Sequence, residues 1–186
     1  MFDVKEQVNR AIRQLIGLKL ARMALAADMR TIQFGITRPG LSGGIVGEYA
    51  LHVQCPWRIE RKCDEQIITG SGDLYKSSDE NDQQNESFDL ESRKNLQEHV
   101  LRGLLRGYDE RTRQIVNSTN LLVVNALEAD SFGGFGLELS GDFQFQVFPD
   151  ASRGEAWRLF RPTAGGEHPV ERPFVVPLEI DSQVPD

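Results

Sequence analysis

The sequence predicts an α+β fold built from internally duplicated antiparallel β-meander units, each of about four strands and each preceded by a helix. Two recurring runs carry this prediction. ALAAD at 24–28 recurs as ALEAD at 126–130, 102 positions later. WRIER at 57–61 recurs as WRLFR at 157–161, 100 positions later. We expect the two units to pack about a pseudo-twofold axis, because one unit alone would bury only a marginal core.

Two further segments in each half alternate apolar and polar residues, in the same order along the chain. Such period-two alternation is typical of a strand with one buried face. The apolar positions are Ile32, Phe34, Ile36, then Tyr49, Leu51, Val53, Cys55 in the first half, and Phe135, Leu137, Leu139, then Phe143, Phe145, Val147 in the second. Matching Phe34 to Leu139 and Val53 to Val147 gives offsets of 105 and 94, so the turn at 37–48 is the longer one.

Each meander is preceded by a segment with helical spacing of apolar residues. Asp3 is placed to cap the first helix, with Glu6 three positions later. The stripes are Val4, Val8, Ala11, Ile12, Leu15 and, later, Leu96, Val100, Leu101, Leu104, Leu105. Residues 18–27 have helical propensity, but their counterpart LLVVNALEA favours a strand, so we predict a strand there.

We expect a single domain over 1–186. Repeat 1 spans about 1–69, an acidic linker about 70–87, and repeat 2 about 88–161, followed by a C-terminal loop and edge strand over 162–186. The linker prediction rests on charge, since residues 73–91 hold seven acidic residues against Lys76 alone. The run SSDENDQQNES has no apolar residue to bury. The sequence leaves open whether the repeats form one continuous sheet, a sandwich or a closed barrel.

Composition disfavours several classes of protein. The formal charge of −7 and the absence of a basic cluster disfavour a nucleic-acid binder. No apolar run reaches transmembrane length, and the charged N-terminus does not fit a signal peptide. With two cysteines, the chain is expected in a reducing cytoplasm. A homodimer stays open.

No metal or cofactor is expected. Asp79, Asn81 and Gln83 alternate as in a calcium-binding EF-hand loop, but Gln84 stands where that loop needs glycine and Leu90 where it needs glutamate. His52 and Cys55 are three apart in a predicted strand and should face opposite ways. The sequence contains no known catalytic signature, which leaves enzymatic activity uncertain and lowers its prior.

The two Trp-Arg pairs are the most distinctive residues for a ligand site. In a strand, Trp57 and Trp157 would face the core, and Arg58 and Arg158 would face the other way. One hypothesis is that Arg58 and Arg158 converge between the repeats to bind a carboxylate or phosphate bidentately. The alternative is that both arginines are solvated or paired with acids.

The segments YALHVQCPWRI at 49–59, GSGDLY at 70–75 and VFPDASRGEAWRLF at 147–160 resemble those of small bacterial proteins of uncharacterised function. They are also similar to β-rich proteins thought to act as immunity partners in polymorphic toxin systems. The resemblance covers residues 17–162 and implies a bacterial, intracellular protein with no assigned catalytic residue.

Three functions follow as hypotheses. The first is a non-catalytic, immunity-like protein–protein interaction module, with Asp79, Glu80, Asp82 and Glu86 meeting a basic site on another protein. The second is a small-molecule-binding or enzymatic domain whose site lies between the two repeats. A structural subunit that pairs through a sheet edge is a third option.

Overall fold

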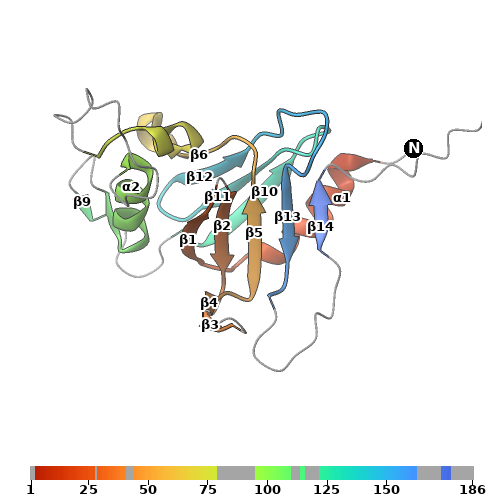
Figure 1. The fold of residues 1–186 in the computed structure, drawn as a ribbon, viewed down its shortest axis with the longest axis horizontal. Helices are drawn as coiled ribbons and strands as arrows, with labels where there is room; N and C mark the ends of the chain where they lie inside the picture. Colours follow the sequence, from red (N-terminus) through yellow and green to blue (C-terminus); the bar gives the residue numbers. More distant parts are fainter. Residues whose placement is uncertain are drawn as a thin grey trace, which may run out of the picture.

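The computed structural model describes residues 3–27, 29–40, 44–78, 95–109, 114–115, 122–162 and 173–176. Within these residues the chain forms two α-helices and antiparallel strands, so the predicted α+β class is confirmed. Figure 1 shows most of the strands between the helices, which lie toward opposite ends of the molecule.

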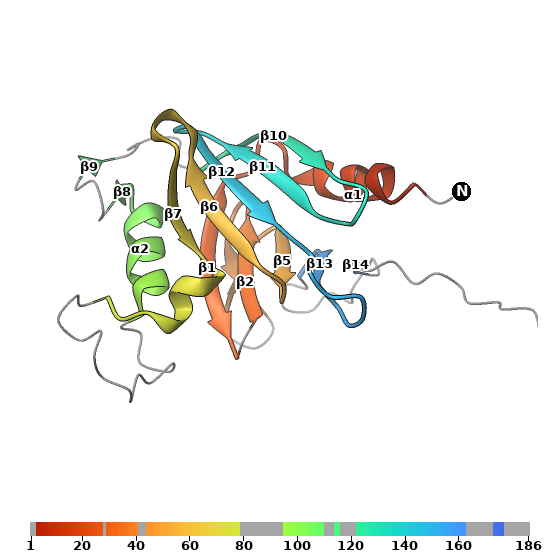
Figure 2. The same cartoon turned by 90° about the horizontal axis from the view of Figure 1, so that it is seen from above.

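Two five-stranded antiparallel sheets form the body of the protein. The first sheet has the order β1 (Leu20–Ala26), β2 (Met29–Phe34), β5 (Tyr49–Val53), β13 (Trp157–Phe160), β14 (Phe174–Val176). The second has the order β10 (Val124–Ala129), β11 (Phe135–Leu139), β12 (Phe143–Val147), β6 (Trp57–Arg61), β7 (Gln66–Gly70). Figure 2 shows the second sheet lying across the first.

The fourth strand of each predicted meander lies in the sheet of the other half. Strand β6 pairs with β12, and β13 pairs with β5. The expectation that four consecutive strands form one meander in each unit is therefore wrong for the fourth strand. The reason lies at the corner before β6, where Pro56 has no amide hydrogen. The amides of Gln54 and Cys55 donate to the Ala156 carbonyl at 2.8 and 3.2 Å, so the chain bends into the other sheet.

The two sheets are joined where β1 and β10 begin. Lys19 forms an isolated antiparallel bridge with Val123. The amide of Val124 donates to the Leu18 carbonyl at 3.0 Å, and the amide of Leu20 donates to the Leu122 carbonyl at 3.0 Å. Backbone hydrogen bonding therefore continues from one sheet into the other at this edge.

Both predicted helices are confirmed, as α1 (Val4–Ile12) and α2 (Leu96–Leu105). Asp3 caps α1 by accepting from the Glu6 amide at 3.2 Å, as its position predicts. Asn95 caps α2 by accepting from the Glu98 amide at 2.8 Å. Helix α1 packs against β10, and α2 packs against β7 and β1.

One apolar core receives side chains from both sheets and both helices. Trp57 and Trp157 are buried in it, as predicted, and the indole Nε1 of Trp157 donates to the Gly133 carbonyl at 2.7 Å. Strand β1 confirms that residues 20–26 are extended and not helical. Ile36, expected to continue the next strand, is instead exposed, because β2 ends at Phe34 and Gly35 has a φ of +80°.

The remaining elements are short. Two small hairpins pair β3 (Arg38–Pro39) with β4 (Ile45–Val46) and β8 (Tyr108–Asp109) with β9 (Gln114–Ile115). Among the described residues, the 3-10 helices are η1 (Arg13–Leu15), η2 (Lys62–Asp64) and η3 (Ser71–Tyr75). Strand β14 lies at a sheet edge, as its prolines predict. No helix within the described ranges combines the length and apolarity needed to cross a bilayer.

Candidate functional site

Arg58 lies on the face of the second sheet that points away from the core. It sits between buried Trp57 and Ile59 in β6, so its side chain takes the opposite face. The Nε atom of Arg58 lies 2.9 Å from Glu60 Oε2, an ion pair without hydrogen-bond geometry, and its guanidinium lies 5.0 Å from the centre of the Phe148 ring. Arg58 is therefore paired with an acid and stacked on an aromatic ring.

Arg158 lies on the outward face of the first sheet. Its Nε is 3.2 Å from His52 Nδ1, on the neighbouring strand, and 3.4 Å from Glu155 Oε1. Burial, and then the positive charge of Arg158, lower the pKa of His52 to about 4. This imidazole is therefore neutral at pH 7.

Arg58 and Arg158 do not converge. They belong to different sheets, and each side chain points away from the shared core. The geometry that joint bidentate binding requires is therefore absent. Asp79, Glu80, Asp82 and Glu86 lie outside the described residues.

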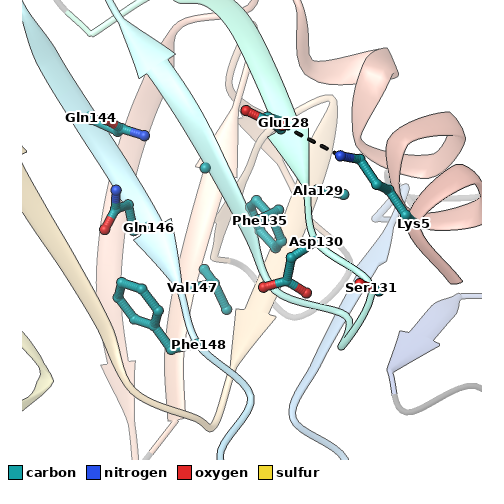
Figure 3. Close-up of a pocket in the computed structure, with 11 residues that line it drawn as sticks. Lys5, Glu128, Ala129, Asp130, Ser131, Phe135, Gln144, Gln146, Val147 and Phe148 are labelled. Atoms are coloured by element: carbon teal, nitrogen blue, oxygen red, sulfur yellow. Dashed lines mark hydrogen bonds and ion pairs between the residues drawn. The ribbon is translucent and has the colours of Figure 1, made fainter.

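A first hollow, of about 360 Å³, lies over β10, β11 and β12 beside α1 (Figure 3). Gln144 and Gln146 alternate with buried Phe145, so they line it from the outward face of the sheet. Lys5 pairs with Glu128 at 3.4 Å, and Asp130 Oδ1 accepts two backbone amides of the β10–β11 turn at 2.7 and 2.8 Å. The charged groups that line this hollow thus already have partners.

A second hollow, of about 320 Å³, is lined by residues of the first half of the chain and by Gln97. It is formed by the end of the β1–β2 hairpin, the corner between β5 and β6, η3, and the first turn of α2. We call it the Arg30 hollow and define it by Arg30, Cys55, Trp57, Gly72, Tyr75 and Gln97. Tyr75 is 67% exposed and marks the outer wall.

Arg30 is the unusual residue of this hollow. Its side chain is 2% exposed, and its Nη1 donates to Glu98 Oε1 at 2.5 Å. The guanidinium lies 5.9 Å from the centre of the Trp57 ring. Its Nε and Nη2 are buried and have no hydrogen-bond partner among the described residues. Burial lowers the pKa of Arg30, and Glu98 opposes that shift through its hydrogen bond and charge.

Nε and Nη2 lie on one edge of the planar guanidinium and form a fork that matches the two oxygens of a carboxylate. The same chain contains a filled example. Arg61 uses this edge to hold Asp64, with Nε 3.0 Å from Oδ1 and Nη2 2.5 Å from Oδ2. An unsatisfied buried donor costs about 1–3 kcal/mol. The Nε and Nη2 donors of Arg30 therefore favour a bound group that accepts two hydrogen bonds.

Gln97 contributes a second unsatisfied group. It is 2% exposed in the first turn of α2, and its Nε2 donates to the Gly70 carbonyl at 2.7 Å. Its Oε1 is buried without a hydrogen-bond partner among the described residues. The residues that line the Arg30 hollow thus include a donor fork and an acceptor, and all three atoms are buried behind the accessible surface of the hollow.

Other chemistry in the hollow is limited. Burial raises the pKa of the Cys55 thiol to about 12, so Cys55 is not a thiolate nucleophile at neutral pH. Within the part of the chain that the structure describes, no three His, Cys, Asp or Glu side chains gather as a metal site would require. The arrangement is suited to binding a polar anion.

Sequence reasoning missed Arg30 and Gln97, although both carry a readable signal. Arg30 is in phase with Ile32 and Phe34, the buried positions of β2. Gln97 is three and four positions from Val100 and Leu101, on the buried face of α2. A polar residue in phase with an apolar face needs a partner, and neither the strand nor the helix supplies a complete one.

No protein-family model matches this chain, and neither the curated proteins nor the solved structures contain a significant match.

Proposed function

We propose that this chain is a small-molecule-binding protein that holds a carboxylate-bearing ligand in the Arg30 hollow. The observation that carries the proposal is the Nε–Nη2 fork of Arg30, which is buried and lacks a partner among the described residues. A carboxylate would place one oxygen on each donor, as Asp64 does on Arg61. The hollow is lined by residues of the first half of the chain and by Gln97, and contains neither Arg58 nor Arg158, so it is a different site from the one between the repeats that the second hypothesis from the sequence expects.

The fork is enclosed, so a ligand reaches it only when a wall moves. The outer wall is η3 (Ser71–Tyr75), a 3-10 helix, whose hydrogen bonds have poorer geometry than those of an α-helix. We expect association slower than about 10⁵ M⁻¹s⁻¹, because binding that needs a conformational change is slow.

A thermal-shift series tests this function. Acetate, propionate and benzoate are added to wild type, Arg30→Met and the matched control Arg22→Met, at constant ionic strength with chloride as reference. Arg22 is exposed on β1 and loses the same charge. At ten times the dissociation constant, a ligand specific to the native state adds about 1.4 kcal/mol of stability. We expect this gain in wild type and Arg22→Met only. Equal gains in all three proteins, or none in wild type, would contradict the proposal.

The immunity-like interaction role stays a second candidate. The outward face of the second sheet offers Phe148, which is 40% exposed beside the hollow of Figure 3 and stacked by Arg58. The acidic residues of 73–91 favour a partner with a basic surface. If so, the association rate with that partner falls as salt rises. A salt-independent rate would remove the acidic residues from this role.

We also propose that the chain is internally duplicated and packed about a pseudo-twofold axis. The order β1-β2-β5-β13-β14 maps onto β10-β11-β12-β6-β7 when the halves are exchanged, which supports the proposal. The pairs Phe34↔Tyr49 and Leu139↔Phe143 agree with the offsets of 105 and 94. Lys19 and Val123, bridged to one another, are 104 positions apart, and the register of β1 and β10 gives the same offset, so the ALAAD–ALEAD match at 102 is two positions out of structural register. We propose, separately, a cytoplasmic location, which is compatible with the free thiols of Cys55 and Cys63.

A further inference from the structure

The orientation of the Gln97 side chain is set by its neighbour. The Gly70 carbonyl is an acceptor only, so the Gln97 atom 2.7 Å away must be the amide nitrogen. The other end of the amide is then Oε1, a buried acceptor without a partner among the described residues. An occupant of the hollow has to offer this atom a hydrogen-bond donor.

The acceptor and the fork are held together by consecutive residues of α2. Gln97 lines the hollow, and the next residue, Glu98, holds Nη1 of Arg30 at 2.5 Å. The first turn of α2 therefore fixes Gln97 relative to Arg30. A ligand that fills both groups needs two acceptor atoms for the fork and one donor for Oε1.

The number of free acceptors restricts that donor. Arg30 already pairs with Glu98, and the unsatisfied acceptor among the described residues of the hollow is the uncharged oxygen of Gln97. An ammonium carries three donors, so two of its N–H groups would lose water without gaining a partner there. A neutral N–H or O–H suits the acceptor better.

The size of the hollow argues for more than one bound water. A single water occupies about 30 Å³ of liquid volume. The hollow measures about 320 Å³, and its wall includes apolar Leu25, Leu74 and Trp57. This space fits a small organic acid with a few carbon atoms.

Resting on the proposed function, we propose that the ligand is a carboxylate with a neutral donor beside it, such as an N-acyl amino acid or a 2-hydroxy acid. The carboxylate binds Nε and Nη2 of Arg30, and the N–H or O–H donates to Gln97 Oε1. Free amino acids, which carry an ammonium, bind more weakly.

Matched ligand pairs test this inference by the fluorescence of Trp57 and Trp157 or by NMR titration. N-acetylglycine is compared with 4-oxopentanoate, in which a CH₂ replaces the N–H, and glycolate is compared with propionate. Glycine tests the ammonium. We expect each donor-bearing acid to bind about tenfold more tightly than its partner, and glycine more weakly than N-acetylglycine.

Variants assign the preference to Gln97. Gln97→Leu should remove the tenfold preference and leave the affinity for 4-oxopentanoate nearly unchanged. The control Gln66→Leu, at an exposed position of β7, should retain it. A readout that needs no variant is the side-chain NH₂ resonance of Gln97, which should shift with N-acetylglycine more than with 4-oxopentanoate.

The outcomes separate this inference from the proposed function. If wild type binds both members of each pair equally, the donor requirement is wrong while carboxylate binding stands. If wild type binds none of these acids, the proposed function itself fails, and the fork holds ordered water only.

Discussion

One core position differs in chemical kind between the two sheets, with Arg30 in the first and Phe135 at the corresponding place in the second. In the first sheet Arg30 pairs with Val53, and its guanidinium lies 5.9 Å from the ring of Trp57. In the second sheet Phe135 pairs with Val147, and its ring meets Trp157 edge-on at 4.9 Å. Trp157 is thus in contact with an apolar ring, and Trp57 with a charged guanidinium.

The difference shows what the position requires. Phe135 satisfies it without polar atoms, so the fold alone does not need an arginine there. Arg30 introduces buried donors that the described residues leave unmatched. A buried group that costs stability without completing the fold points to a role in binding.

The largest expected effect comes from placing a charge at the apolar position. Phe135→Arg would bury a guanidinium with no acid placed as Glu98 is placed for Arg30. We expect a loss of more than about 3 kcal/mol in the free energy of unfolding, measured by urea titration. The control Phe132→Arg, at a side chain 83% exposed, should change it by less than about 0.5 kcal/mol. A loss below about 1 kcal/mol for Phe135→Arg would show that the Phe135 position also tolerates a buried charge. The difference between Phe135 and Arg30 would then give no reason to assign Arg30 a role in binding.

The reverse change should affect stability less. Arg30→Met removes the unmatched donors, keeps the volume, and leaves Glu98 unpaired but partly exposed to water. We expect the free energy of unfolding to change by less than about 2 kcal/mol, because the loss of the unmatched donors offsets the cost of leaving the partly hydrated Glu98 without its partner. A loss greater than about 2 kcal/mol would make Arg30 a structural residue.

The outward faces of the two sheets offer a second contrast, at the residues beside the Trp-Arg pairs. Arg158 pairs in register with His52, and Arg58 with Gln146. The pKa of His52 is lowered to about 4 in the folded protein. Between pH 6.5 and 4 the imidazole is therefore protonated in the unfolded chain but neutral in the native state. Stability is therefore full above pH 6.5 and falls as the pH decreases toward 4.

The loss due to His52 should be about 1–2 kcal/mol, after allowance for its partial exposure. The substitution His52→Gln, which copies the second sheet, should remove this part of the decline when urea titrations at pH 7.5 and 4.5 are compared. Equal declines in wild type and His52→Gln would mean that the imidazole is protonated as readily in the native state as in the unfolded chain.

The smallest effect is expected at Arg58. Its pair with Glu60 is partly exposed, and its stacking on Phe148 is open to solvent. Arg58→Gln should lower the free energy of unfolding by about 0.5 kcal/mol or less. It should also leave acetate binding unchanged, since Arg58 lies outside the Arg30 hollow. A loss of acetate binding in this variant would move the site to the face of the second sheet.

Sequence patterns predicted the elements better than their partners. The alternation of Tyr49, Leu51 and Val53 and the cap at Asp3 are local properties, and both were confirmed. The exchange of β6 and β13 between the sheets depends on the corner at Pro56 and on contacts with Ala156, a hundred residues away. No local pattern contains that information.

The candidate site also depends on long-range contacts that no local sequence pattern contains. Arg58 attracted attention because it belongs to a recurring run, but its place in β6 turns it away from the core. Arg30 has no recurring counterpart, since Phe135 stands at the matching position. Its importance arises from Gln97 and η3, which fold next to it from distant parts of the chain.

The central claim, that the fork of Arg30 receives a carboxylate, is tested most directly by the arginine Nε–Hε resonances in a ¹H–¹⁵N NMR spectrum. The Arg30 signal is assigned by its loss in Arg30→Met, and wild type is titrated with N-acetylglycine. We predict a saturable downfield shift of the Arg30 Hε, while the Hε of Arg61, already bound to Asp64, stays in place. An Arg30 signal that does not move at saturating N-acetylglycine and acetate would contradict the claim.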